Sequence, residues 1–165
     1  MRKLIMVYSC LFFLMGCVPH SADVKPTKVS VDFFKLSISE RIKQFKNHTL
    51  EDQYELYLVG NQIVHPPAIY LAEPFAEQGP IVVPFLKKKL EVAKEEVTIR
   101  DISLVMFTLS QKKLYDFSKD NELMDLLAQR ANNMEGMWKD ITLKNISGIR
   151  TNMEKEPKTA GESEK

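Results

Sequence analysis

Apolar residues recur three or four positions apart through most of this 165-residue chain, from about residue 38 to residue 146. Side chains at this spacing lie on one face of an α-helix, so the pattern predicts a succession of amphipathic helices. The run from Ile102 to Leu109 is apolar enough for a buried strand. The length of the surrounding pattern, and the lack of recognisable partner strands, favour a helix there too. We therefore expect an all-α fold.

Polar residues mark where the helices begin. A Ser or Thr followed three residues later by an acidic residue predicts a helix start in which the side chains cap the free backbone N–H groups. Three pairs have this spacing: Ser37 with Glu40, Thr49 with Asp52, and Thr98 with Asp101. Ser118 is expected to begin a later helix. The expected helices cover about residues 38–45, 50–64, 68–78, 80–93, 99–109, 119–135 and 137–146.

Proline and glycine set the other boundaries. Pro67 is expected as the first residue of the helix at 68–78, where its missing N–H costs no hydrogen bond. Pro74 lies inside that helix and is expected to kink it. Gly79 and Gly136 are expected to end helices, because glycine readily adopts the left-handed conformation that follows a last helical turn. Short loops between consecutive helices favour antiparallel hairpins.

One stretch resembles a junction between HEAT repeats. Residues 83–90 (VPFLKKKL) are followed by a charged loop and by the sequence VTIR at 97–100. In HEAT repeats a helix with a Pro-x-Leu-like start precedes a loop and a Val-Arg pair, although the loop here carries no Asp. The resemblance covers about residues 66–134 and implies a right-handed stack of helical hairpins. An irregular bundle of about six to seven helices is the alternative.

The first 17 residues have a different character. Arg2 and Lys3 precede a nearly continuous apolar run from Leu4 to Met15. This run has the length of an export signal and is shorter than the roughly 20 residues of a membrane span, which argues against an uncleaved anchor. Gly16 and Cys17 follow it, in place of an Ala-x-Ala cleavage site.

The sequence Leu14-Met15-Gly16-Cys17 resembles the lipobox of bacterial lipoproteins, whose pattern is Leu, a variable residue, Gly or Ala, and Cys. The resemblance implies a diacylglyceryl group on the Cys17 thiol and cleavage between Gly16 and Cys17. Several acyl chains anchor a protein stably in a bilayer. Val18 stands where an Asp tends to retain lipoproteins of enteric-type bacteria in the inner membrane. The resemblance therefore implies attachment to the outer membrane, facing the periplasm.

These features divide the chain into four expected parts: a removed signal peptide (1–16), a lipidated flexible tether (17–29), a helical domain (30–150) and a disordered tail (151–165). The tether is polar and contains Pro19 and Pro26. The tail has one Met and no other large apolar side chain, so it cannot bury enough apolar surface to offset the entropy cost of ordering. Since Cys10 lies in the signal peptide and Cys17 would carry lipid, no disulfide is expected. The 23 basic and 22 acidic residues nearly balance, so nucleic acid is not an expected partner.

No catalytic or metal-binding constellation is recognisable, and no cofactor is expected. The motifs of phosphate loops, dinucleotide sites and nucleophile elbows do not occur. None of the histidines His20, His48 and His65 has a second ligand at metal spacing. Lys87, Lys88 and Lys89 are expected to form a solvated helix face, with contact to anionic lipid as the alternative. Tyr54, Tyr57 and Tyr70 are expected in the core, with an interface as the alternative.

Taken together, these observations predict a lipid-anchored protein of the bacterial envelope. The protein would be attached to the membrane through lipid on Cys17. Its helical body would bind an envelope protein and would not catalyse a reaction. Stacked helices provide extended surfaces for such binding. A small-ligand-binding protein or an enzyme, with a site built from scattered residues, is the alternative.

Overall fold

The computed structural model describes residues 24–154, and the secondary structure of this part is entirely helical. It contains eight α-helices: α1 Lys28–Phe33, α2 Ile38–Phe45, α3 Leu50–Gln62, α4 Ala72–Ala76, α5 Val82–Val92, α6 Glu96–Gln111, α7 Asn121–Asn132 and α8 Met137–Glu154. Three short 3-10 helices lie at Ile69–Leu71, Gly79–Ile81 and Phe117–Lys119. The expected all-α class is confirmed.

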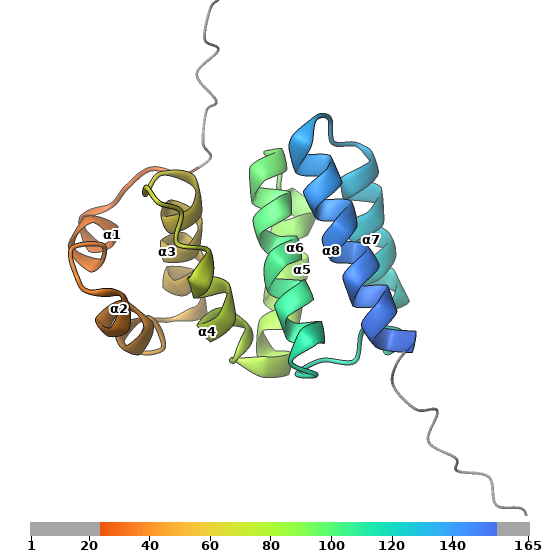
Figure 1. The fold of residues 1–165 in the computed structure, drawn as a ribbon, viewed down its shortest axis with the longest axis horizontal. Helices are drawn as coiled ribbons and strands as arrows, with labels where there is room; N and C mark the ends of the chain where they lie inside the picture. Colours follow the sequence, from red (N-terminus) through yellow and green to blue (C-terminus); the bar gives the residue numbers. More distant parts are fainter. Residues whose placement is uncertain (1–23, 155–165) are drawn as a thin grey trace, which may run out of the picture.

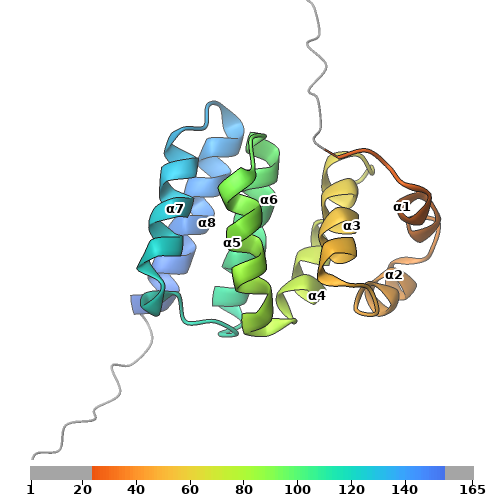
Figure 2. The same cartoon turned by 180° about the vertical axis from the view of Figure 1, so that it is seen from behind.

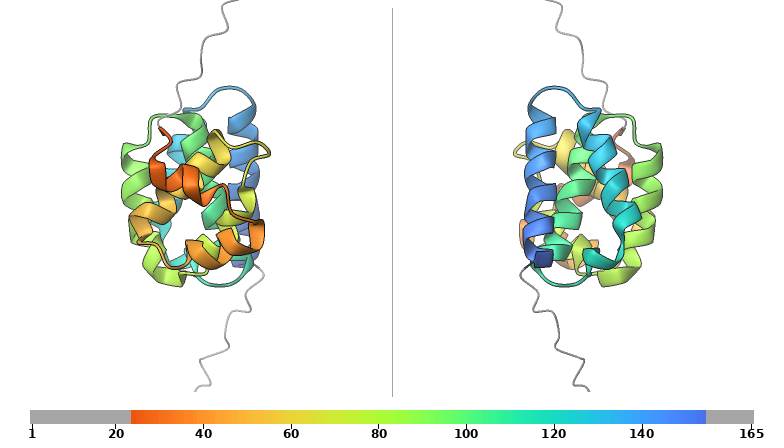
Figure 3. Two further views of the ribbon diagram at one scale, coloured as in Figure 1. Left: turned by 90° about the vertical axis from the view of Figure 1, so that its left-hand side faces the viewer. Right: turned by 90° about the vertical axis from the view of Figure 1, so that its right-hand side faces the viewer.

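The helices form an irregular bundle. Helices α5, α6, α7 and α8 stand side by side and run alternately up and down, while α3 and α4 pack beside α5 and α6 (Figures 1 and 2). The short helices α1 and α2 cover the outer side of α3, as the end view shows (Figure 3), and the buried apolar side chains of these helices belong to one cluster. Helix α6 is central, since it packs against α3, α4, α5, α7 and α8. The HEAT resemblance of residues 66–134 stays a prediction.

The aromatic centre of the core joins the amino-terminal helices to the bundle. The ring of Phe75, on α4, is fully buried and lies 5.9 Å from Phe45, 5.9 Å from Tyr57 and 6.4 Å from Phe85. Tyr54 is buried as well, at 9% exposure. Tyr54 and Tyr57 therefore occupy the core, as expected. On the other side of the bundle, the Phe107 ring of α6 packs against Gly148 of α8, where a Cβ would come within 2.3 Å of it.

Two of the predicted capping pairs are confirmed, and the third is wrong. Ser37 and Thr49 are the N-caps of α2 and α3, and their hydroxyls accept from the N–H groups of Glu40 and Asp52. Helix α6, in contrast, begins at Glu96 with no side-chain cap. Thr98 and Asp101 consequently lie inside this helix, one turn apart on the same face, and both are buried.

Proline and serine positions also differ from the prediction. Pro67 lies in the loop ahead of the 3-10 turn Ile69–Leu71 and does not begin a helix. Because α4 begins only at Ala72, Pro74 falls in its first turn, where the missing N–H costs no intrahelical bond and requires no kink. Asp120, and not Ser118, caps α7, since its carboxylate accepts from the N–H of Leu123.

The glycine predictions fit the backbone. Gly79 and Gly136 have φ angles of +68° and +74°, in the left-handed region that favours glycine. Gly79 follows α4, and Gly136 lies in the loop between α7 and α8. Each glycine thus allows the chain to turn between consecutive helices. Ile38, the first residue of α2, is 56% exposed.

The folded part extends beyond both predicted boundaries. Thr27 and Ser30 form a capping box that begins α1, and Val24 packs against the core, so part of the expected tether is ordered. Helix α8 continues to Glu154, four residues beyond the expected end at 150. Met153 explains this extension, because it follows Ile149 by one turn and packs against the core.

Candidate functional site

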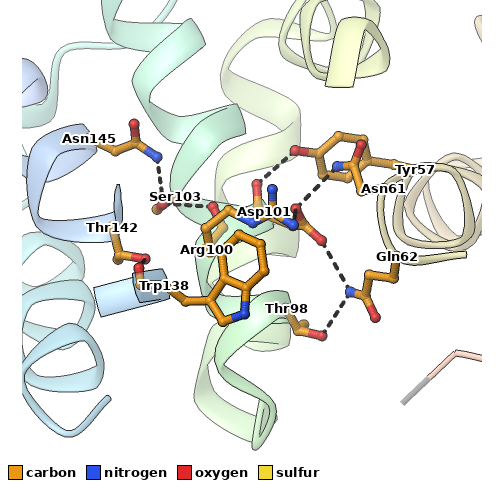
Figure 4. Close-up of polar contacts among 10 residues, drawn as sticks. All are labelled: Tyr57, Asn61, Gln62, Thr98, Arg100, Asp101, Ser103, Trp138, Thr142 and Asn145. Atoms are coloured by element: carbon orange, nitrogen blue, oxygen red, sulfur yellow. Dashed lines mark hydrogen bonds and ion pairs between the residues drawn. The ribbon is translucent and has the colours of Figure 1, made fainter. Parts of the chain in front are cut away.

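A buried polar network joins α3 to α6 (Figure 4). The Asp101 carboxylate accepts hydrogen bonds from Asn61 Nδ2 and Gln62 Nε2, both at 3.1 Å. The backbone carbonyl of Asp101 accepts from the Tyr57 hydroxyl at 2.9 Å. Tyr57, Asn61 and Asp101 are all buried. We call this set the Asp101 network; it links α3 to α6 by hydrogen bonds.

The spacing of the residues explains why the network forms. Tyr57 and Asn61 are four positions apart on α3, and Thr98 and Asp101 are three apart on α6, so each pair lies on one helix face. Gln62 Nε2 also donates to Thr98 Oγ1 at 3.2 Å, which makes a second link between the helices. Thr98 and Asp101 therefore form hydrogen bonds between α6 and α3, and they do not cap the start of a helix.

Arg100 extends the polar contacts from α6 to α8. Its guanidinium forms an ion pair with Asp101 at 3.0 Å and lies 4.5 Å from the centre of the Trp138 ring, close enough for a cation–π contact. One turn further along, Ser103 donates to the Arg100 carbonyl at 2.7 Å and accepts from Asn145 Nδ2 at 2.9 Å. Helix α6 is thus held on both sides by polar groups (Figure 4).

Burial determines the protonation chemistry of this network. It raises the pKa of the Asp101 carboxyl to about 6, although Arg100 and the amides of Gln62 and Asn61 favour the charged form. Burial, followed by the charge of Asp101, raises the pKa of Tyr57 well above its ordinary value. Asp101 is 0% exposed, so its carboxyl cannot exchange a proton directly with a molecule bound at the surface.

An open groove lies between α3 and α5 and reaches Thr98, which accepts a hydrogen bond from Gln62 of the network. It has a volume of about 450 Å³. Lys89 crosses it, pairing with Glu51 at 2.5 Å while its ammonium group lies 5.1 Å from the Tyr54 ring and 5.2 Å from the Phe85 ring. We call this surface the α3–α5 groove; its lining residues are Val24, Lys25, Thr27, Glu51, Tyr54, Glu55, Leu58, Lys89, Val92, Ala93 and Thr98.

The groove combines an apolar floor with a charged rim. Leu58 and Ala93 are nearly buried, whereas Val92 is 71% exposed at one end. Glu55 Oε1 is buried and has no hydrogen-bond partner among residues 24–154. Thr98 lines the groove and also accepts from Gln62, so it connects this surface to the Asp101 network. Such a surface can bind an extended peptide or a small molecule that carries both apolar and cationic groups.

The residues predicted for chemistry or attachment are dispersed. Gly16, Cys17 and His20 lie outside the described residues. The imidazole of His48 lies edge-on to Phe33 at 6.0 Å, and His65 is exposed in a loop. Within residues 24–154, no group of three or more His, Cys, Asp or Glu side chains could hold a metal ion.

The three lysines of α5 do not act as one cationic patch. Lys87 pairs with Glu122 of α7 at 2.9 Å, and Lys89 pairs with Glu51 of α3. Lys88, between them, is exposed. Two of the three therefore bridge α5 to its neighbours. The sequence pattern did not predict a role for Asn61 and Gln62. The available signal was their spacing: each follows a core residue, Tyr57 or Leu58, by four positions, which places polar groups on the inner face of α3.

Comparison with protein-family models, with curated proteins and with solved structures finds no match to this chain. None of the helices in the described part of the chain is both long enough and apolar enough to span a membrane.

Proposed function

We propose that this chain is a lipid-anchored protein of the bacterial envelope whose helical body binds another envelope protein. The observation that carries the proposal is the sequence Leu14-Met15-Gly16-Cys17 at the end of a short apolar run. Lipid attached to Cys17 would hold the body on the membrane. Val18, in place of an Asp, favours the outer membrane and a body that faces the periplasm.

The α3–α5 groove supports the binding part of the proposal. Its apolar floor lies beside charged side chains, as in surfaces that recognise protein segments. Two of those side chains, Glu51 and Lys89, neutralise each other. The carboxyl of Asp101, whose pKa is raised to about 6, has no exposed surface. These features favour binding over acid–base catalysis in the groove.

A small ligand is the second candidate for the groove. The volume of about 450 Å³ falls within the range of small-molecule sites. The unpartnered oxygen of Glu55 offers an acceptor to an amine or amide group. A ligand-binding protein, or an enzyme acting on such a ligand, would use this oxygen for orientation.

We expect a photo-reactive amino acid at Glu51, on the groove rim, to cross-link one defined envelope protein in intact cells. Reversing the charge of the neighbouring side chain by Glu55→Lys should abolish the product, because it removes the acceptor at the groove. Asp140→Lys, the same charge reversal at an exposed position of α8, should leave the product intact. Thermal melting of both variants checks that the body remains folded.

Persistence of the cross-link in Glu55→Lys, with a body that melts normally, would exclude the groove as the binding surface. If neither Glu51 nor another position around the groove yields a protein product, a small ligand becomes the better assignment. Equilibrium dialysis against small amines and amides would then be the decisive assay.

A further inference from the structure

Apolar side chains are exposed at the end of the bundle where the described chain begins. Val92 ends α5 and Met137 begins α8, and they are 71% and 65% exposed. Both lie at the end where the chain enters the fold, while α8 finishes at the opposite end (Figures 1 and 2). Val24 lines the same groove as Val92, which confirms that the entry point and Val92 are neighbours. We call this the entry end of the bundle.

Polar contacts connect the loops of the entry end. The Arg130 guanidinium donates to the Ala93 carbonyl at 3.4 Å and also to the carbonyl of Glu91, and the N–H of Glu135 donates to Glu96 at 2.5 Å. The α5–α6 and α7–α8 loops are therefore held together. Val92 and Met137 both lie at this end of the bundle, each next to one of these two loops.

The length of the connection to Cys17 limits where the bilayer can be. Only residues 18–23 separate Cys17 from Val24. Even fully extended, seven residue steps span at most about 25 Å, and a flexible chain of that length averages about 15 Å between its ends. Helix α6, with 16 residues, spans about 24 Å from the entry end to the opposite end. The opposite end could therefore reach the bilayer only with this connection almost fully extended, so a lipid on Cys17 favours the orientation in which the entry end faces the membrane.

From this geometry we infer that the entry end rests on the bilayer, with Val92 and Met137 in contact with the lipid headgroup region. The inference rests on the proposed lipidation of Cys17. Charges of both signs surround these residues, namely Lys25, Lys94, Glu95 and Glu135. Contact is therefore made by apolar side chains and does not require anionic lipid. The opposite end, with Ile81 and the end of α8, points away from the membrane and is open to the envelope (Figure 1).

The test uses the lipidated mature protein, recovered from membranes and placed in phosphatidylcholine vesicles. An environment-sensitive fluorophore is attached to each of three variants: Val92→Cys, Met137→Cys and, as control, Ile81→Cys. The native cysteines do not react with the label, since Cys10 is removed with the signal peptide and the Cys17 thiol is blocked by lipid. Ile81 is 63% exposed, similar to the two test positions, but lies at the far end. We expect headgroup-nitroxide lipid to quench the labels at 92 and 137 strongly, equally at low and high salt, and to spare the label at 81.

Equal, weak quenching at all three positions, or stronger quenching at 81, would overturn the inference. The mass of the purified protein separates this failure from failure of the proposed function. A protein with lipid on Cys17 but no quenching at 92 and 137 remains an anchored protein with another orientation. A protein that carries no lipid on Cys17 refutes the anchor itself, and the inference falls with it.

Discussion

The Asp101→Ala variant is expected to lose about 3–5 kcal/mol in its free energy of unfolding at neutral pH. Removing the carboxylate leaves the Arg100 guanidinium, whose side chain is only 11% exposed, without its charged partner. It also takes the acceptor away from the amides of Asn61 and Gln62. Substitutions that leave buried polar groups without hydrogen-bond or charge partners are among the most destabilising in proteins.

Urea unfolding followed by far-ultraviolet circular dichroism measures this loss. Asp140→Ala, an exposed change of the same type in the first turn of α8, is the matched control and should shift stability by about 1 kcal/mol or less. A loss in Asp101→Ala no larger than that of the control would mean that the Asp101 network does not hold α3 to α6.

The second large effect is a pH dependence of stability that originates in the same carboxyl. Burial raises the pKa of Asp101 from 3.8 to about 6, so the folded protein holds this proton more tightly than the unfolded chain. The resulting stabilisation is complete below about pH 4 and is lost as the pH rises to about 6. A difference of roughly two pKa units corresponds to about 3 kcal/mol. This pH dependence has the opposite sign to that of a carboxylate stabilised by an ion pair, which contributes stability at high pH and loses it as the pH falls.

Comparison with Asp101→Asn isolates this contribution from those of other carboxyls. Exposed groups such as Glu77, whose pKa is lowered mainly by hydrogen bonds from Lys46 and Lys112, make stability rise with pH. Their contribution is the same in both proteins, so it cancels when the two pH profiles are compared. Gln62 Oε1 has no hydrogen-bond partner in the described part of the chain, so rotating this amide would provide an acceptor for the introduced amide. We expect the stability of the variant, measured relative to the native chain, to rise by up to about 3 kcal/mol as the pH goes from about 4 to about 6, and to stay constant at higher pH. Parallel pH profiles for the two proteins would contradict the raised pKa.

Local patterns in the sequence were sufficient for much of the fold. Ser37 and Thr49 cap helices because no competing element buries them, and the period around Tyr54 and Tyr57 correctly placed both rings in the core. The same Thr-x-x-Asp pattern at Thr98 was misleading, because capping and a buried polar helix face use the same residue types at the same spacing. Whether this pattern caps a helix or lies on a buried helix face depends on where α3 packs, and the local sequence does not contain that tertiary information.

The site was less predictable than the fold. The α3–α5 groove combines residues from the entry segment, α3, α5 and α6, and no local spacing brings Val24 next to Val92. Helix α1 was missed because Pro26 and neighbouring polar residues indicated a tether, whereas Thr27 and Ser30 together supply a capping box. Met153, one turn after Ile149, was the available signal that α8 continues.

The mass and terminal sequence of the protein isolated from bacterial membranes test the central claim most directly. We predict a chain that begins at Cys17 and carries a diacylglyceryl group on that residue. The Cys17→Ser variant should keep residues 1–16 and lack the lipid mass. A mature chain that begins elsewhere, or a Cys17 with an unmodified thiol, would contradict the assignment of this protein as a lipid-anchored component of the envelope.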